Sequence, residues 1–290
     1  MSFEKRLQNR EFLVLAEMNT PKGVDISRFV TDARRIKGRV DAVVVPDMEN
    51  GVMRMSALAG AVLVQQQGLE AIVNVYTRDR NRMALQGDLL AAHVLGLRNL
   101  LVVQGEHMAN GDHRDAMPVN DLDTHGLVAA IKSLQQGKDL AGFDLDGNPQ
   151  FTMGCTLSSW SDSKALEAEM EQAKHKIDAG AQYLVTPPVF DPERFQADLQ
   201  MLARFNVPVI VTIFLIKSVA VARYIATNEP GAGISEAMIR RLRKSSDRES
   251  EALKLAAETI TGLRGRVQGV LIQTMGWEHR LTTILDAAGL

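Results

Sequence analysis

Two glutamates follow apolar runs at points where buried strands would end. Glu17 directly follows the run F-L-V-L-A. Glu106 comes after the run L-L-V-V, from which Gln104 and Gly105 separate it. A carboxyl at the end of a buried strand must be paired, hydrogen-bonded or raised in pKa, and a raised carboxyl is a usable general acid near neutral pH. The pattern therefore predicts acid–base chemistry at Glu17 with Glu106 nearby. The alternative for each is a structural carboxylate bonded to backbone or to a neighbouring cation.

Further rim residues, most of them polar, stand where the apolar runs end. They are Asn19, Asp47, Asn74, Tyr76, Arg78, Gln104, His107, Thr156, Ser158, Ser159, Trp160, Thr186, Thr212, Lys217, Gln273 and Met275, with Gly105 as a flexible point among them. His107, Asp112 and His113 offer plausible metal ligands, but their spacing matches no standard zinc pattern. We therefore expect a solvated loop with one functional carboxylate there, and no metal.

Eight strand-like runs, each separated by a helical pattern, would position these side chains. The strands are expected at Phe12–Met18, Ala42–Val45, Ala71–Tyr76, Leu100–Gln104, Phe151–Leu157, Tyr183–Thr186, Val207–Phe214 and Val267–Thr274. The helices are expected at Ile26–Lys37, Met53–Gln67, Asp79–Leu95, Thr124–Gln136, Ser163–Ala179, Pro192–Phe205, a doubled region Ser218–Leu263, and Trp277–Ala288. Strict alternation of strand and helix indicates parallel strands joined by right-handed crossovers.

Eight such units in 290 residues fit a closed (β/α)8 TIM barrel, in a single domain over residues 1–290. A doubly wound open sheet is the alternative. A dinucleotide-binding sheet of that kind would need a glycine-rich phosphate loop, and the chain has no G-x-G-x-x-G or Walker sequence. Barrel enzymes carry their chemistry at the C-terminal ends of the strands, so we expect the polar side chains above to share one site.

Composition excludes several functional classes. The net charge is −2 and no basic block is interleaved with aromatics, which disfavours nucleic acid as a partner. The single cysteine, Cys155, excludes an intrachain disulfide and a cysteine-based zinc cluster, and we expect it to be a small buried strand residue. No segment approaches the ~20 apolar residues that span a bilayer, and the amino terminus lacks a signal-peptide run. We expect a cytoplasmic protein without membrane contact.

Eight short motifs occur in order along nearly the whole chain. They are A-E-M-N-T-P-K-G (16–23), R-D-R-N-R-M-A-L-Q-G-D-L-L (78–90), L-V-V-Q-G-E-H (101–107), G-K-D-L-A-G (137–142), K-I-D-A-G-A (176–181), I-K-S (216–218), N-E-P-G (228–231) and G-W-E (276–278). Each is weak alone. Together they make the chain resemble the catalytic barrel of methylenetetrahydrofolate reductase, in its short bacterial form.

The resemblance implies a flavin-bearing barrel, with FAD or FMN, that reduces 5,10-methylenetetrahydrofolate to 5-methyltetrahydrofolate in one-carbon metabolism and methionine biosynthesis. Glu17 matches the acid that protonates the folate, and Glu106 falls where the family usually has an aspartate that contacts the pterin. The positions implied for the flavin are Asn74, Tyr76, Gln104, Gly105, His107, Thr156, Trp160, Gln172, His175 and Lys176. The positions implied for the substrate are Asp47, Glu106, Thr186 and Met275.

Several rim positions depart from the family pattern. Pro46 stands where threonine is usual, Tyr76 where a smaller threonine is common, and Pro187 where glutamine helps to hold the pterin; Glu106 is one methylene longer than aspartate. Proline offers no side-chain hydrogen bond, so each lost contact could cost about 1–3 kcal/mol of pterin selectivity. One alternative is a relative that acts on another pterin or one-carbon adduct, or lacks flavin. Another is a non-catalytic barrel that binds folate or a redox partner.

The source of electrons is left open by the resemblance. NAD(P)H or the redox centre of a partner subunit would reduce the flavin, and any iron–sulfur or zinc chemistry must come from another chain, because only Cys155 is present. A homo-oligomer is the default expectation for a barrel.

Overall fold

The strands form one closed parallel barrel in chain order, as predicted. The structure is a computed structural model and describes residues 2–290. The strands are β1 (Leu13–Glu17), β2 (Ala42–Val45), β3 (Ala71–Tyr76), β4 (Asn99–Val103), β5 (Thr152–Thr156), β6 (Tyr183–Pro188), β7 (Val209–Phe214) and β8 (Gly269–Gln273). Pairing of β1 with both β2 and β8 closes the barrel.

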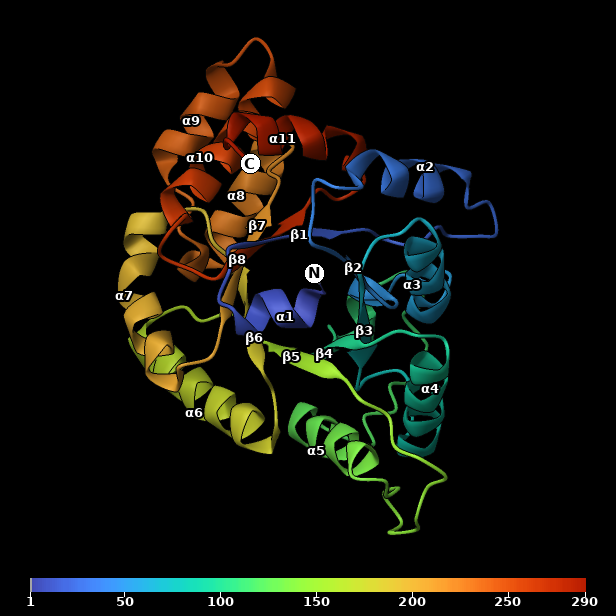
Figure 1. Cartoon of the computed structure of the whole chain (residues 1–290). Helices are drawn as coiled ribbons and strands as arrows, with labels where there is room; N and C mark the ends of the chain where they lie inside the picture. Colours follow the sequence, from blue (N-terminus) through green and yellow to red (C-terminus); the bar gives the residue numbers. More distant parts are fainter. Residues whose placement is uncertain (1) are drawn as a thin grey trace.

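Helices surround the barrel, and Figure 1 shows this outer ring around the central strands. They are α2 (Ser27–Ile36), α3 (Ala57–Gln66), α4 (Arg82–Val94), α5 (Thr124–Gln135), α6 (Ser163–Ala179), α7 (Pro192–Leu202), α8 (Val219–Asn228), α9 (Glu236–Lys244), α10 (Arg248–Leu263) and α11 (Leu281–Ala287). Short 3-10 turns lie at Glu49–Gly51, Met108–Asn110, Ala203–Phe205, Pro230–Ala232 and Glu278–Arg280. No helix within residues 2–290 is long and apolar enough to cross a membrane.

The barrel interior is filled by alternate residues of the strands. Leu13 and Leu15 of β1 belong to this inner cluster together with Tyr183 of β6, whereas the intervening residues face the helices. Gly154 of β5 makes room for Tyr183, because a Cβ there would lie 2.3 Å from the tyrosine ring. The alternation continues along β1 to Glu17, so its side chain turns into the barrel.

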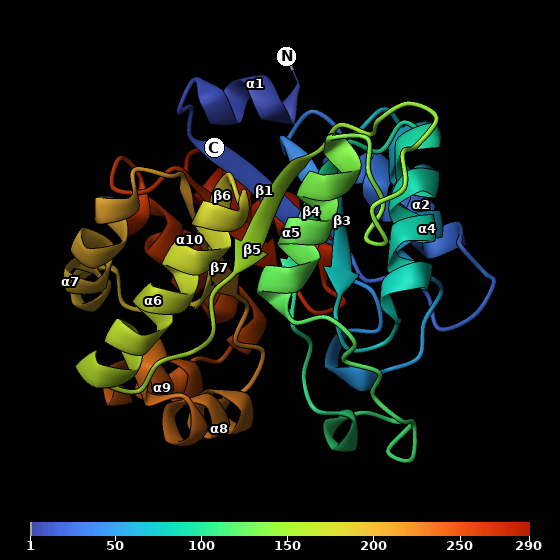
Figure 2. The ribbon, with the colours of Figure 1, turned by 90° about the horizontal axis from the view of Figure 1, so that it is seen from below.

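A short N-terminal helix, α1 (Phe3–Gln8), was not predicted. It lies across the end of the barrel opposite the C-terminal strand ends (Figure 2). Phe3 and Leu7 are buried in the inner cluster, and the Phe3 ring meets Tyr183 edge-on at 5.6 Å between centroids. The helix therefore plugs the N-terminal end of the barrel and leaves the opposite end for chemistry.

The predicted helical region Ser218–Leu263 is three helices rather than two. Side-chain caps divide it: Ser218 accepts from the Val221 amide, Ser235 from Met238 and Asp247 from Ser250. Each cap satisfies a free backbone N–H and starts a new helix. Cys155 is buried on β5, as expected for a small strand residue.

Candidate active site

A cavity of about 470 Å³ opens at the C-terminal ends of the strands. Most of the predicted site residues line it: Glu17, Asn74, Tyr76, Gln104, Gly105, Glu106, Thr156, Thr186 and Met275. The other acidic residues on its wall are Glu49 and Glu229. Within the described chain the lining therefore carries four glutamates and no lysine, arginine or histidine. Such a wall favours a neutral or cationic ligand over an anionic one.

Glu17 is the most deeply placed acid of the cavity, with an exposed fraction of 5%. The β1–β8 register sets it opposite Gln273, whose Nε2 donates to Glu17 Oε2 at 2.8 Å. Burial raises the pKa of Glu17 well above that of an ordinary carboxyl, and the nearby Glu49 carboxylate raises it further. The Gln273 hydrogen bond opposes these effects without cancelling them. Glu17 can therefore hold a proton near neutral pH.

Glu49 is a second titratable acid of the cavity, and sequence reasoning missed it. It lies on the 3-10 turn after β2, where Asn19 Nδ2 donates to Glu49 Oε2 at 3.2 Å. Burial, reinforced by the Glu106 charge, raises its pKa to about 7, although Asn19 and Arg54 act in the opposite direction. The turn has no apolar periodicity, so only its position beyond a strand end could have marked Glu49.

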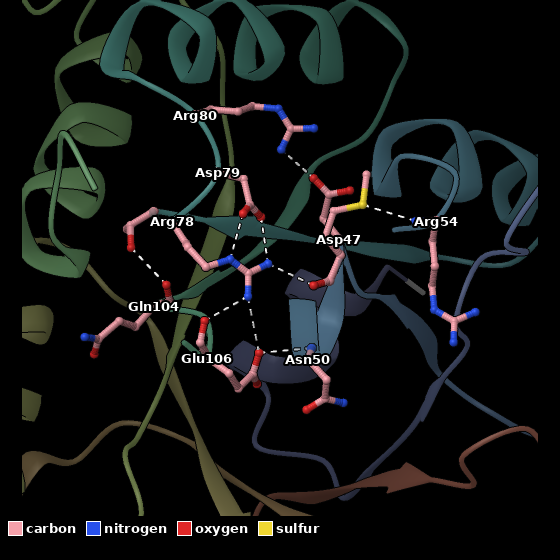
Figure 3. Close-up of polar contacts among 10 residues, drawn as sticks. Asp47, Asn50, Arg54, Arg78, Asp79, Arg80, Gln104 and Glu106 are labelled. Atoms are coloured by element: carbon pink, nitrogen blue, oxygen red, sulfur yellow. Dashed lines mark hydrogen bonds and ion pairs between the residues drawn. The ribbon is translucent and has the colours of Figure 1, made fainter. Parts of the chain in front are cut away.

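Arg78 joins the loops that carry these acids (Figure 3). Its guanidinium forms two hydrogen bonds with Asp79, at 2.7 and 2.9 Å, and donates to the backbone oxygens of Met48 and Glu106 at 2.9 and 3.0 Å. Glu106 in turn accepts from the Asn50 amide at 3.0 Å. Arg78 is almost fully buried, so it fixes the loops after β2 and β4 relative to each other instead of facing a ligand.

The loop after β2 is held in a strained backbone conformation. Met48 and Asn50 have φ values of 52° and 55°, and Met275 at the end of β8 has 51°. Left-handed conformations of such residues are uncommon and persist where the surrounding contacts impose them, often at functional sites. Two of them, Asn50 and Met275, line the acid-lined cavity.

Asn74 carries an unsatisfied acceptor at the cavity. Its Oδ1 is buried and has no hydrogen-bond partner within the described chain. A buried amide oxygen without a donor is costly, and an N–H group on a ligand ring would supply one. Next to it, Gly105 packs tightly against Tyr76, because a Cβ at Gly105 would lie 2.9 Å from Tyr76 Cδ1. These residues fit a flat, hydrogen-bonding ring.

Asp47, predicted to contact substrate, lies outside the cavity lining. Its carboxylate accepts from the Ala57 amide at 3.1 Å and pairs with Arg80 at 2.6 Å. Strand alternation explains this placement. Val44 points into the barrel, and Asp47 lies three residues further along, so its side chain points to the opposite face. Asp47 therefore anchors the start of α3.

His107 and Trp160 also lie outside the main cavity lining. His107 is exposed, and its Nδ1 accepts from the Ala109 amide at 3.2 Å. Trp160 Nε1 donates to Asp198 at 2.9 Å, and the indole lines a small adjoining cavity with Pro187 and Glu229. In the loop after β4, Asp112 pairs with Lys22 and His113. Residues 2–290 contain no group of three His, Cys, Asp or Glu side chains arranged to hold a metal.

The three α6 residues implied for a flavin phosphate do not present a free cation. Gln172 and His175 are exposed, and the His175 ring faces His125 of α5, with 6.4 Å between centroids. Lys176 is 5% exposed, and its Nζ lies 3.1 Å from Glu169 and 3.0 Å from the Thr156 carbonyl oxygen. Its charge is thus neutralised internally. The cavity fits the ring of a flavin, whereas the α6 positions do not fit its phosphate tail.

The family model described as methylenetetrahydrofolate reductase matches residues 2–289. The chain is also similar to "Methylenetetrahydrofolate reductase 2" of Schizosaccharomyces pombe, with 21% identity over 251 residues, which is 81% of this chain. The match spans 38% of the length of that relative.

Solved structures show the same fold in proteins of different sequence. Two crystal forms of 2,3-dimethylmalate lyase, a member of the PEP mutase/isocitrate lyase superfamily, align with TM-scores of 0.54 over 99% of this chain. They cover 86% and 84% of the lyase chain at 12% and 11% identity. At such low identity the likeness concerns the barrel alone.

Proposed function

The chain belongs to the methylenetetrahydrofolate reductase family, and we propose that it reduces 5,10-methylenetetrahydrofolate to 5-methyltetrahydrofolate with Glu17 as the general acid. The observation that carries this proposal is the buried carboxyl of Glu17 in the cavity, hydrogen-bonded to Gln273 and raised in pKa. Family membership supports a folate reductase, and the geometry supports the acid.

Glu17 would act on the five-membered ring of the substrate. Its proton would pass to N10 as the bond between N10 and the methylene carbon breaks, leaving an iminium cation at N5. A hydride added to that carbon then yields the methyl group, which balances the reaction. General acid catalysis of this kind typically contributes 10²–10⁴-fold in rate.

The charge of the cavity suits that cation. Glu49, Glu106 and Glu229 line the same wall as Glu17, and no basic side chain of the described residues does so. Fixed carboxylates near a developing positive charge stabilise it more strongly than water does. The same acids offer acceptors for the N–H groups of a pterin, while Asn74 Oδ1 offers another.

Flavin as the hydride carrier is the family's implication, and the residues support it in part. A bound flavin would supply hydride; Asn74 and Gly105 fit its ring, and Lys176 does not fit its phosphate because Glu169 already pairs with it. That pairing favours a second form of the function, in which this chain lacks flavin and a reduced nicotinamide donates hydride to the iminium.

One experiment tests both forms. The purified protein is scanned for flavin absorbance, then given methylenetetrahydrofolate with NADH, NADPH or a chemically reduced flavin under anaerobic conditions. Formation of 5-methyltetrahydrofolate supports the proposal, and the spectrum together with the donor that works identifies the carrier. Failure with every donor, in protein that binds added folate, contradicts the reductase assignment and favours the binding alternative.

A further inference from the structure

A second cavity adjoins the acid-lined one on the side of α2. It has a volume of about 270 Å³ and is lined by residues after β1, including Asn19 and Thr20, together with Arg28, Arg54 and Glu278. Met275 lines both cavities. Asn19, on the second cavity, donates to Glu49, on the first. The two cavities are therefore neighbours that share a wall.

Arg54 is the unpaired cation of this second cavity. Its Nη1 donates to the Thr20 carbonyl oxygen at 3.1 Å, and it forms no ion pair with any carboxylate of residues 2–290. In Figure 3 its guanidinium extends away from the cluster formed by Asp47, Asp79 and Glu106. A half-buried guanidinium with free N–H groups is suited to a carboxylate or phosphate.

The other charges of the second cavity are already compensated. Arg28 lies 3.6 Å from Asp32 and 3.9 Å from Glu278, and it donates to the Gly276 carbonyl oxygen at 2.6 Å. Asp32 also pairs with Arg35 at 2.5 Å. Glu278 accepts from the Gly276 amide at 2.8 Å. Asp25 also lines this cavity, where the Ser27 amide donates to it at 2.9 Å. Arg54 is the cation of the lining that forms no ion pair within residues 2–290, although its charge also acts on Glu49 across the shared wall.

We propose that the second cavity binds, through Arg54, the anionic end of the ligand whose ring occupies the acid-lined cavity. The inference rests on the proposed function, because a reduced folate has this form: a hydrogen-bonding ring at one end and the carboxylates of a glutamate at the other. The acidic wall of the first cavity disfavours such carboxylates, whereas Arg54 attracts them. A phosphate of a nicotinamide nucleotide carries the same chemistry.

The test compares ligands with and without the anionic end. KM is measured for methylenetetrahydrofolate and for the amide of methylenetetrahydropteroate, which ends in an uncharged carboxamide, in the wild type and in Arg54→Gln, Arg54→Lys and Arg240→Gln. The last variant removes an exposed charge on α9 that lines neither cavity. We expect Arg54→Gln to raise KM about tenfold for the folate, as befits loss of a charge-assisted hydrogen bond, and to leave the KM of the uncharged amide unchanged. Arg54→Lys should keep most of the affinity.

A binding measurement separates this inference from the proposed function. Calorimetric Kd values are obtained for p-aminobenzoylglutamate, the uncharged p-aminobenzamide and NADPH with the same variants, since none of these needs turnover. A loss confined to the glutamate probe supports the anion site with a carboxylate as occupant, even if the wild type shows no reductase activity. A loss confined to NADPH supports it with a phosphate as occupant. Unchanged constants for every ligand in a folded Arg54→Gln protein overturn the inference.

Discussion

Glu17 is the residue on which the proposed chemistry depends most. Replacement by glutamine keeps the size and the hydrogen bond with Gln273, and it mimics the protonated acid that burial favours. We therefore expect Glu17→Gln to fold normally and bind folate, and to lose turnover by at least about 10²-fold, because the transferable proton is gone. Steady-state kinetics and folate binding check this. Turnover within a few-fold of wild type would remove Glu17 from the acid role.

Glu49 should control the pH range in which Glu17 works. Above pH of about 7 the Glu49 carboxyl is ionised, and its charge raises the pKa of Glu17. In Glu49→Gln that influence is absent, so the pKa of Glu17 falls and the alkaline limb of the kcat/KM profile moves to lower pH. Glu229→Gln is the matched control, since Glu229 lines the same cavity but is not among the groups that shift Glu17. If the alkaline limb of the kcat/KM profile stays at the same pH in Glu49→Gln, the charge of Glu49 does not set the pKa of Glu17.

Among the elements, the strands were the most predictable part. Apolar runs such as Ala42–Val45 and Ala71–Tyr76 match β2 and β3, because strands buried on both faces need continuous apolar residues. Helix α1 escaped prediction since its six residues include only two that are buried, Phe3 and Leu7, which are too few to show a period. The boundaries of α8–α10 depend on polar caps, which periodicity does not detect.

Helix α1 should contribute stability without affecting catalysis. Phe3→Ala removes a fully buried ring from the plugged end of the barrel, so we expect a loss of about 3–5 kcal/mol in the free energy of unfolding. Its effect on KM should be small, because α1 lies at the end opposite the cavity. Urea denaturation measures the first quantity. Phe143→Ala is the control: that ring is 71% exposed, and its removal should change stability by less than about 0.5 kcal/mol.

Helix α6 permits a test of the pairing between Lys176 and Glu169. Lys176→Met leaves Glu169 buried without its partner, and we expect it to lower the free energy of unfolding by about 3–5 kcal/mol. The double variant Lys176→Met/Glu169→Leu should recover most of that loss and keep any flavin that the wild type carries. Denaturation and the visible spectrum measure the two effects. Loss of flavin from a stable double variant would instead give Lys176 a phosphate-binding role.

At the scale of the whole molecule, strand order predicted which residues share the cavity at the C-terminal strand ends, and local side-chain direction accounts for those that lie outside it. Glu17 and Thr156 share one cavity although they lie on opposite halves of the sequence, because the barrel brings all C-terminal strand ends together. Asp47 lies at a strand end too, yet it turns outward to Arg80. The compensation of Lys176 by Glu169 depends on helix packing, and nothing in the spacing of α6 reveals whether its lysine is free.

The concentration of acids at one end of the barrel also predicts how the molecule responds to pH. Glu17 and Glu49 both have pKa values raised by folding, to about 7 for Glu49 and well above the ordinary range for Glu17. Below the unfolded-state pKa of about 4.3 both are protonated in either state. As pH rises above it, the unfolded chain loses these protons while the folded chain retains them, so stability falls until the folded-state pKa is passed.

We therefore expect the melting temperature of the wild type to fall from pH 5 to pH 8, whereas Glu17→Gln/Glu49→Gln should show a flatter dependence. At pH 8 the double variant should melt higher than the wild type, by roughly 2–4 °C for each kcal/mol of relieved burial penalty. At pH 5 the difference in melting temperature between the two proteins should be smaller. At that pH, which is close to the unfolded-state pKa, the unfolded chain gains less stability by releasing these two protons. Parallel curves for the two proteins would mean that solvent or a bound cation compensates these carboxylates, and the acid role of Glu17 would then lose its electrostatic basis.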